Sequence, residues 1–171
     1  MSAITAVITL WKRNYLEEQL ESILAQTHPP EQIVLVQNEA GAVDIDAVVE
    51  KFRARHVNIV RIRSDHNYKY FLRFTLGSLL DTEYLFFIDD DIIPGRRWLE
   101  LCVEKSKQYN AVIAPTGRII PKDSFRPEKM FIFRRPEKYA AGDAADGESN
   151  ASHSDQHVDY GCNSYFIRAE W

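Results

Sequence analysis

The strongest strand pattern of the chain leads directly into three adjacent carboxylates in Tyr84-Leu85-Phe86-Phe87-Ile88-Asp89-Asp90-Asp91-Ile92-Ile93-Pro94-Gly95. Five consecutive apolar residues, aromatic and β-branched ones among them, are typical of a strand that is buried on both faces of a parallel sheet. Pro94 and Gly95 then mark the turn into a helix. The stretch therefore predicts a strand, an acidic turn and a helix, as in an α/β domain.

The alternation of strands and helices extends in both directions from this stretch. Strands are expected at 3–10, 32–37, 57–62, 84–88 and 111–114, and helices at 16–24, 43–52, 71–80 and 96–109. Such alternation predicts a doubly wound, mostly parallel sheet with helices on both faces. After residue 115 the pattern changes to short β-rich pieces at 118–120, 130–133 and 158–167, and the polar segment 142–156 is expected to be a mobile loop. We interpret residues 1–171 as a single domain with halves at 1–115 and 116–171.

Composition and charge narrow the functional classes. Hydrophobic residues make up 45% and charged residues 27% of the chain, as in ordinary globular domains. A net charge of -4 provides no basic field, so a nucleic acid partner is not expected. No apolar run reaches the roughly 20 residues of a transmembrane segment, and no signal peptide pattern is present, so the expected location is cytoplasmic. Cys102 and Cys162 lack the spacing of a zinc site or a disulfide framework.

The acidic run is the main candidate for chemistry. In open parallel sheets, ligands bind at the carboxyl ends of the strands where the strand order reverses. Three adjacent carboxylates repel one another, and a bound cation relieves that repulsion. Mg2+ and Mn2+ often bind one or two carboxylates together with the phosphates of a substrate. We therefore expect Asp91 to bind the metal, and Asp89, on the same side of an extended chain, to hold the ribose or a water on the metal. The alternative is that Asp91 only caps the next helix.

Several stretches, taken in order, resemble the glycosyltransferases of the GT-A fold, which is Rossmann-like. The likeness is strongest to family 2, with some likeness to the exostosin-like enzymes. The resembling stretches are residues 6–13 (AVITLWKR), 20–27 (LESILAQT), 31–38 (EQIVLVQN), 87–95 (FIDDDIIPG, similar to the DxD motif) and 158–168 (VDYGCNSYFIR). Their order and spacing are more specific than the DxD motif alone.

The resemblance implies roles for residues along the chain. Thr9 and Trp11 would line the base pocket, and Asn38 would hydrogen-bond a base edge where family 2 enzymes usually have two aspartates. Arg73 falls where exostosin-like enzymes place an arginine near the nucleotide, and its guanidinium suits a diphosphate. The remaining candidates for binding the nucleotide-sugar are Asn67, Lys69, Asp89 and Asp90.

The resemblance implies a metal-dependent glycosyltransferase that uses Mn2+ or Mg2+. It would move a sugar from a nucleoside-diphosphate donor, most simply a UDP-sugar, to a hydroxyl of a carbohydrate or another acceptor. Residues 1–115 would then bind the nucleotide and residues 116–171 the acceptor. The first alternative is a nucleotidyltransferase, which usually needs a glycine-rich loop that 10–15 does not contain. The second is a binding module that does not catalyse transfer.

The catalytic base is the least defined part of this interpretation. An inverting transfer needs a carboxylate within hydrogen-bond reach of the acceptor hydroxyl. GT-A enzymes commonly supply it from an acidic motif after the stretch that resembles 158–168. Asp159 is the inward candidate that remains, Glu170 is too early, and we expect the chain to be C-terminally incomplete as a catalyst. The sequence does not indicate the sugar, the acceptor, the stereochemical outcome or the oligomeric state.

Overall fold

The computed structural model describes residues 2–39, 44–119, 131–134, 149–151, 160–162 and 164–171. These residues form two compact units, Met1–Ile113 with Phe166–Trp171, and Ala114–Tyr165. The expected organisation, one domain with halves at 1–115 and 116–171, stays a prediction. The return of the last residues to the first unit is a long-range connection that the order of elements along the chain does not predict.

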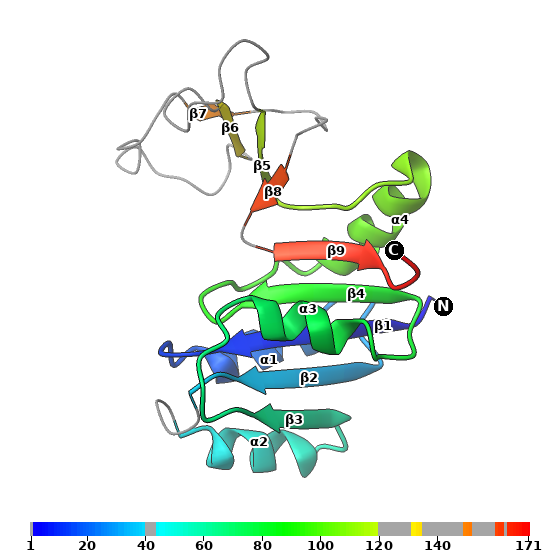
Figure 1. The fold of residues 1–171 in the computed structure, drawn as a ribbon. Coiled ribbons are helices and arrows are strands. Elements are labelled where there is room, and N and C mark those ends of the chain that lie inside the picture. Colours follow the sequence, from blue (N-terminus) through cyan, green and yellow to red (C-terminus); the bar gives the residue numbers. More distant parts are fainter. Residues whose placement is uncertain (1, 40–43, 120–130, 135–148, 152–159, 163) are drawn as a thin grey trace. The chain divides into compact units, whose positions relative to one another are not determined.

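The first unit is built on a five-stranded sheet with the order β3-β2-β1-β4-β9 (Figure 1). Its strands are β1 (Ile4–Leu10), β2 (Gln32–Gln37), β3 (Ile59–Arg63), β4 (Tyr84–Asp89) and β9 (Ser164–Arg168). β1 pairs in parallel with β2 and β4, and β2 pairs in parallel with β3. β9 runs in the opposite direction at the other edge. This mostly parallel sheet confirms the predicted fold class.

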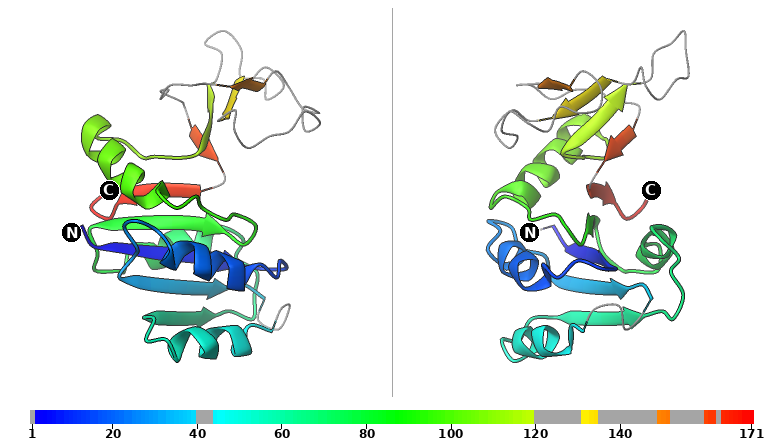
Figure 2. Two further views of the ribbon diagram at one scale, coloured as in Figure 1. Left: turned by 180° about the vertical axis from the view of Figure 1, so that it is seen from behind. Right: turned by 90° about the vertical axis from the view of Figure 1, so that its left-hand side faces the viewer.

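Four helices cover the two faces of this sheet. They are α1 (Leu16–Leu24), α2 (Asp46–Arg53), α3 (Phe71–Gly77) and α4 (Trp98–Tyr109). Figure 2 shows α1, α2 and α4 on one face and α3 on the other. Because both faces are covered, β1 is buried along its whole length, and so are the first five residues of β4. None of the helices in the described part of the chain is long and apolar enough to span a membrane.

The close approach of α3 to β4 depends on a glycine. A Cβ atom on Gly77 would lie 2.6 Å from Cζ of Phe87, which is closer than side-chain atoms approach one another. α3 buries only Gly77 and Arg73. Since Arg73 lies one turn before Gly77 on the same face, the helix directs this arginine onto the sheet near the end of β4.

The second unit contains a small sheet with the order β7-β6-β5-β8. Its strands are β5 (Thr116–Ile119), β6 (Phe131–Arg134), β7 (Ser149–Ala151) and β8 (Tyr160–Cys162). β5 pairs antiparallel with both β6 and β8, and β6 pairs in parallel with β7. The expected β-rich region is therefore present. The segment 142–156 was expected to be a loop; only its residues 149–151, which form β7, are among the described residues.

Two strand predictions were wrong in detail. Residues 111–114 were expected to be the fifth strand of the main sheet, but there Ile113 makes only an isolated bridge to Phe166. The fifth strand is β9, from the end of the chain. Residues 158–167 were expected to be one strand, but β8 and β9 belong to different sheets. β propensity shows that a segment is extended, while tertiary contacts determine which strand it pairs with.

Candidate functional site

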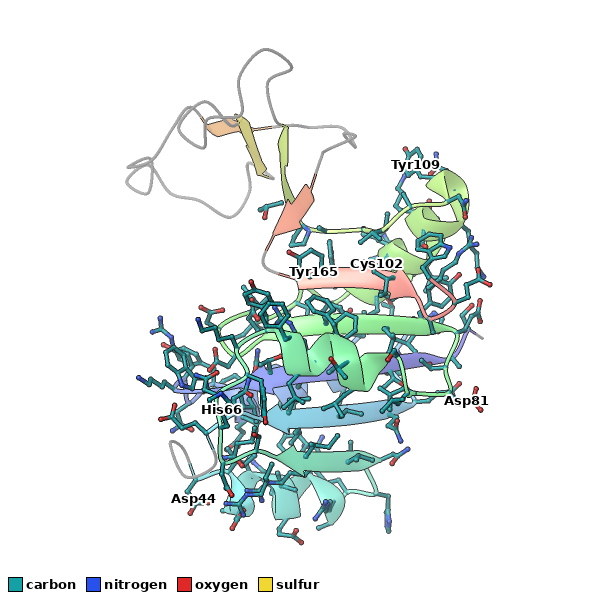
Figure 3. All side chains as sticks on the ribbon, in the orientation of Figure 1. Asp44, His66, Asp81, Cys102, Tyr109 and Tyr165 are labelled. Atoms are coloured by element: carbon teal, nitrogen blue, oxygen red, sulfur yellow. The ribbon has the colours of Figure 1, made fainter. Side chains whose placement is uncertain are left out.

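The candidate site lies at the carboxyl ends of β1 and β4. The chain proceeds from β1 through β2 to β3 and then returns to place β4 on the opposite side of β1. The strand order therefore reverses between β1 and β4, where open α/β sheets bind ligands. Thr9 and Asp89 are partners in the register of these two strands. Figure 3 shows Asp44 and His66 at this end of the sheet and Asp81 at the opposite end.

Asp89 is held by an arginine from α3. The guanidinium of Arg73 forms an ion pair with the Asp89 carboxylate, and its Nη1 lies 3.5 Å from Oγ1 of Thr9. Arg73 is 6% exposed, and its Nε is buried without a hydrogen-bond partner among the described residues. The structure thus brings together three candidates that lie far apart in the sequence. In this arrangement the Arg73 guanidinium holds the Asp89 carboxylate of the candidate site.

Asp90 points in another direction, to the loop after β1. Its Oδ2 accepts hydrogen bonds from the backbone N–H groups of Trp11, Lys12 and Arg13, at 3.0, 3.2 and 3.1 Å. Three successive N–H groups that converge on one oxygen form an anion-binding concavity. In this chain the anion is a carboxylate of the protein itself, so Asp90 fixes the loop that carries Trp11.

Asp91 is exposed at the tip of the turn. Ile92 N donates to Asp89 O at 3.3 Å, so Asp90 and Asp91 occupy the two central positions of a hydrogen-bonded turn. Within the described residues the Asp91 carboxylate has no hydrogen-bond or ion-pair partner. The same residues contain no group of three or more His, Cys, Asp or Glu side chains that could hold a metal. An exposed carboxylate of this kind fits a metal that takes its other ligands from a substrate and from water.

Asn38 and Asn67 both contact the backbone of Lys69. Asn38 Nδ2 donates to Lys69 O at 2.8 Å, and Lys69 N donates to Oδ1 of Asn67 at 2.7 Å. Lys69 has a positive φ of 55°. The two hydrogen bonds hold this left-handed backbone conformation. Asn38 is 1% exposed, and its Oδ1 is buried without a partner among the described residues. The predicted contact with a base edge stays a prediction.

Trp11 is presented at the surface of the same end. It is 44% exposed, and its indole Nε1 donates to Oε2 of Glu39 at 3.0 Å. Nζ of Lys12 lies 4.2 Å from the centroid of the indole ring. The ring is therefore oriented by one residue that follows β2 and by one neighbour in its own loop. Glu39 was not among the predicted site residues, since nothing in the linear pattern connects it to Trp11.

Sequence reasoning also missed a polar row on α1 that contacts the acidic turn. Gln19 Nε2 donates to Asp89 O and to Ile92 O, each at 2.7 Å, and Ser22 Oγ donates to Pro94 O at 2.7 Å. The signal was available, because Gln19, Ser22 and Gln26 recur at helical spacing on a face that is otherwise apolar. Asp159, the predicted catalytic base, lies outside the described residues.

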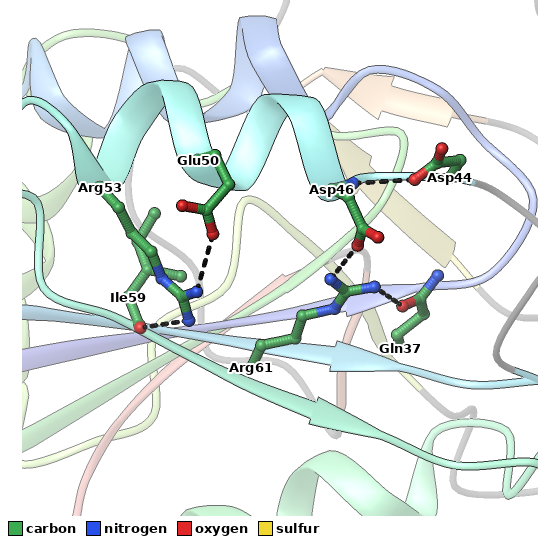
Figure 4. A network of polar contacts seen from close by, with 7 residues as sticks. All are labelled: Gln37, Asp44, Asp46, Glu50, Arg53, Ile59 and Arg61. Carbon is green, nitrogen blue, oxygen red and sulfur yellow. Dashed lines mark hydrogen bonds and ion pairs between the residues drawn. The ribbon is translucent and has the colours of Figure 1, made fainter.

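A second polar network lies at the edge of the same sheet (Figure 4). Arg61 of β3 pairs with Asp46 at the start of α2, and its Nη2 donates to Gln37 Oε1 at 2.9 Å. Oδ1 of Asp44 accepts the N–H of Asp46 at 2.9 Å. The hydrogen bond from Arg61 holds the pKa of the Asp46 carboxyl below its ordinary value. This network joins α2 to the sheet away from the reversal point.

The mostly parallel five-stranded sheet with helices on both faces is an α/β fold of the GT-A type. The chain belongs to glycosyl transferase family 2, whose family model matches residues 5–168. It is 26% identical over 137 residues to a glucosyl-dolichyl phosphate glucuronosyltransferase from Haloferax volcanii. That alignment covers 77% of this chain but only 43% of the relative. The likeness to exostosin-like enzymes stays a prediction.

Solved structures share the fold at low sequence identity. TarS 1-349 from S. aureus, in complex with UDP-GlcNAc, matches with a TM-score of 0.53 and 19% identity over 70% of this chain and 34% of its own. The mannosyltransferase PcManGT from Pyrobaculum calidifontis, in complex with GDP-Man and Mn2+, matches with a TM-score of 0.54 and 16% identity over 71% and 36%. At these identities the matches show the fold alone.

Proposed function

We propose that this chain binds a nucleoside-diphosphate sugar together with Mn2+ or Mg2+ at the carboxyl ends of β1 and β4, and transfers the sugar to an acceptor hydroxyl. The observation that carries the proposal is the division of the acidic run. Asp89 is paired with the charge of Arg73 and Asp90 accepts hydrogen bonds from three backbone N–H groups, while Asp91 is exposed on the turn. The repulsion expected of three carboxylates is thus relieved for two of them, which leaves Asp91 for a cation.

The residues around Asp91 have distinct tasks in this proposal. Asp91 holds the divalent ion, and Asp89, whose direction Arg73 sets, faces the ribose or a water on the ion. Thr9 and Trp11 line the base pocket, and Asp90 keeps the Trp11 loop in place. A bound divalent ion supplies electrostatic stabilisation of the charge that develops on the leaving diphosphate.

The structure changes the task that we give to Arg73. Sequence reasoning directed this guanidinium at the diphosphate, but in the described structure it is buried and paired with Asp89. We therefore propose that Arg73 orients Asp89. Asn38 acts on the nucleotide pocket through the Lys69 backbone that it holds. Asp159 is kept as the proposed base.

Family membership favours glycosyl transfer over nucleotidyl transfer, and two relatives indicate donor classes to test. TarS and PcManGT are described with UDP-GlcNAc and GDP-Man, respectively. The Haloferax relative is named for a lipid-linked acceptor, glucosyl-dolichyl phosphate. We propose that a UDP-sugar is the donor and that the acceptor panel should include lipid-linked glucose.

The test is a donor screen by thermal shift, in which UDP-sugars and GDP-mannose are compared with MnCl2, with MgCl2 and with EDTA. A ligand that binds only the folded state raises the melting temperature, and the rise grows with the logarithm of the free ligand concentration above its dissociation constant. We expect an increase only when a nucleotide-sugar and a divalent ion are both present. Radiolabelled donor with candidate acceptors then separates a transferase from a binding module, since only the transferase forms product.

A further inference from the structure

Gln19 is a polar residue in the core of the first unit. It is 0% exposed and lies on the buried face of α1 beside Leu16, Leu20 and Ile23. Apolar side chains are the usual occupants of such a face, because burying an amide costs free energy unless it is hydrogen-bonded. The reason for a glutamine at this position must therefore lie in what its amide contacts.

The amide of Gln19 closes the acidic turn from the side of α1. Its Nε2 donates to the carbonyl oxygens of Asp89 and Ile92, each at 2.7 Å. Since Ile92 N also donates to Asp89 O, the two carbonyls are the outer positions of one turn. The residues between them are Asp90 and Asp91. One side chain thus fixes both ends of the backbone segment that carries the metal-binding carboxylate.

The orientation of this amide is determined by its partners. Both are carbonyl oxygens, which only accept hydrogen bonds, so the nitrogen must face them. The Oε1 atom then has no partner among the described residues and is buried. A buried acceptor without a partner costs free energy. The Gln19 amide therefore leaves its own oxygen unpaired while its nitrogen satisfies two carbonyls of the turn.

Gln26, two residues after the end of α1, provides a matched comparison. It is also buried, and its Nε2 donates to Ser22 O and Gly95 O, at 3.1 and 2.9 Å. Its Oε1 accepts the N–H of Leu99 at 3.0 Å. Gln26 thus secures the start of α4, beyond Pro94, whereas Gln19 secures the acidic turn itself.

We propose that Gln19 is a positioning residue for metal-dependent nucleotide binding, an inference that rests on the function proposed above. By holding both ends of the turn, it sets the direction in which the Asp91 carboxylate leaves the backbone. Asp90, at the centre of the same turn, is held by its hydrogen bonds to the loop that carries Trp11. With both restraints in place, Asp91 needs little further ordering when an ion and a diphosphate arrive.

The test compares Gln19→Met with Gln26→Met, which remove the amide from each position at nearly the same side-chain length. The dissociation constants of UDP and of GDP are measured by titration calorimetry with saturating MnCl2 and with EDTA, and the melting temperature is recorded for each variant. We expect Gln19→Met to reduce the Mn2+-dependent gain in affinity by roughly tenfold or more, the effect of removing an outer-shell partner. Gln26→Met should lower the melting temperature and leave that gain unchanged.

The outcomes separate the two proposals. If the wild type binds neither nucleotide better with Mn2+, the proposed function fails and this inference falls with it. If the wild type shows the gain and Gln19→Met keeps it, the proposed function stands and the role of Gln19 is overturned. An equal loss in both variants would also overturn it, since it would report only a general loosening of the contact between residues 16–26 and the segment after β4. If Gln19→Met does not fold, Gln19→Asn is compared with Gln26→Asn, because the shorter amide cannot reach both carbonyls.

Discussion

Two arginine–aspartate pairs stand at the same end of one sheet and serve different purposes. Arg73 and Asp89 meet at the centre, between β1 and β4, with side chains that are 8% and 41% exposed. Arg61 and Asp46 meet at the edge, between β3 and α2, with 16% and 64% exposed. In both pairs a largely buried guanidinium holds a partly exposed carboxylate, and its Nε has no partner among the described residues.

The difference between the pairs lies in their surroundings. The central pair adjoins Thr9 and the turn that exposes Asp91, at the point where the strand order reverses. The edge pair adjoins Gln37 and the start of α2, so its polar atoms serve to dock a helix. The same kind of ion pair thus belongs to the candidate binding site at the centre of the sheet, and attaches a helix to the sheet at its edge. The place in the topology decides which, because only the reversal point leaves space for a ligand between diverging connections.

The largest difference in nucleotide binding is expected between two variants that each neutralise an exposed carboxylate. One carboxylate lies near the central pair and the other near the edge pair. Asp91→Asn should weaken Mn2+-dependent binding of UDP or GDP by about 100-fold or more, since even outer-shell changes at metal sites cost about 10- to 100-fold. Asp44→Asn at the edge keeps an oxygen for the Asp46 N–H and should not change binding. Titration calorimetry measures both. Unchanged affinity in Asp91→Asn would remove the metal from our proposal.

The second test removes each guanidinium in turn. Arg73→Met leaves the Asp89 carboxylate unpaired, and we expect a loss of about 1 to 3 kcal/mol in the free energy of unfolding, less than the 3 to 5 of a fully buried pair. Arg61→Met should cost no more than that. Urea unfolding measures stability, and calorimetry measures UDP and GDP binding. Binding should weaken only in Arg73→Met, and equal binding in both variants would contradict a special role for the central pair.

The third test uses Gln37, the last residue of β2, and Asn38, which follows it: Gln37 contacts the edge network and Asn38 the Lys69 backbone. Asn38→Ala releases the Lys69 carbonyl, and it should weaken nucleotide binding by about 1 to 3 kcal/mol, the cost of an unpaired buried group. Gln37→Ala should leave binding unchanged, because Gln37 contacts Arg61 of the edge network. A difference between UDP and GDP in Asn38→Ala would indicate contact with the base. An equal loss for both nucleotides, or no loss, would mean that Asn38 only holds the Lys69 backbone and does not contact the base.

The smallest effect is expected from titration of the edge pair. The pKa of Asp46 is lowered in the folded protein by its hydrogen bond from Arg61. A carboxyl with a depressed folded-state pKa contributes stability that is present above its unfolded-state pKa and is lost as the pH falls through the folded-state value. The contribution is small, because the Asp46 carboxylate is exposed and its interaction is screened by solvent and salt. Urea unfolding from neutral to acidic pH should show an acid-side loss that is slightly reduced in Asp46→Asn, and an unaltered pH profile would contradict it.

The fold class and the position of the acidic turn could be predicted from the amino-acid sequence. Buried strands and amphipathic helices leave periodic patterns that a reader can recognise without the structure. The position of 89–91 after a strand of five apolar residues already implied the carboxyl end of a central strand. Thr9, Arg73 and Asn38 could be named from residue type and from resemblance to a family.

The contacts of these residues could not be predicted in this way and became known from the three-dimensional structure. It directs Asp89, Asp90 and Asp91 to three different surroundings, pairs Arg73 with Asp89, and places Gln19 under the turn. It also brings β9 from the end of the chain to the edge of the main sheet. The physical reason is that periodicity reports which face of an element is buried, whereas hydrogen bonds and ion pairs depend on distances between atoms that lie far apart in the sequence. Those distances exist only once the sheet has assembled.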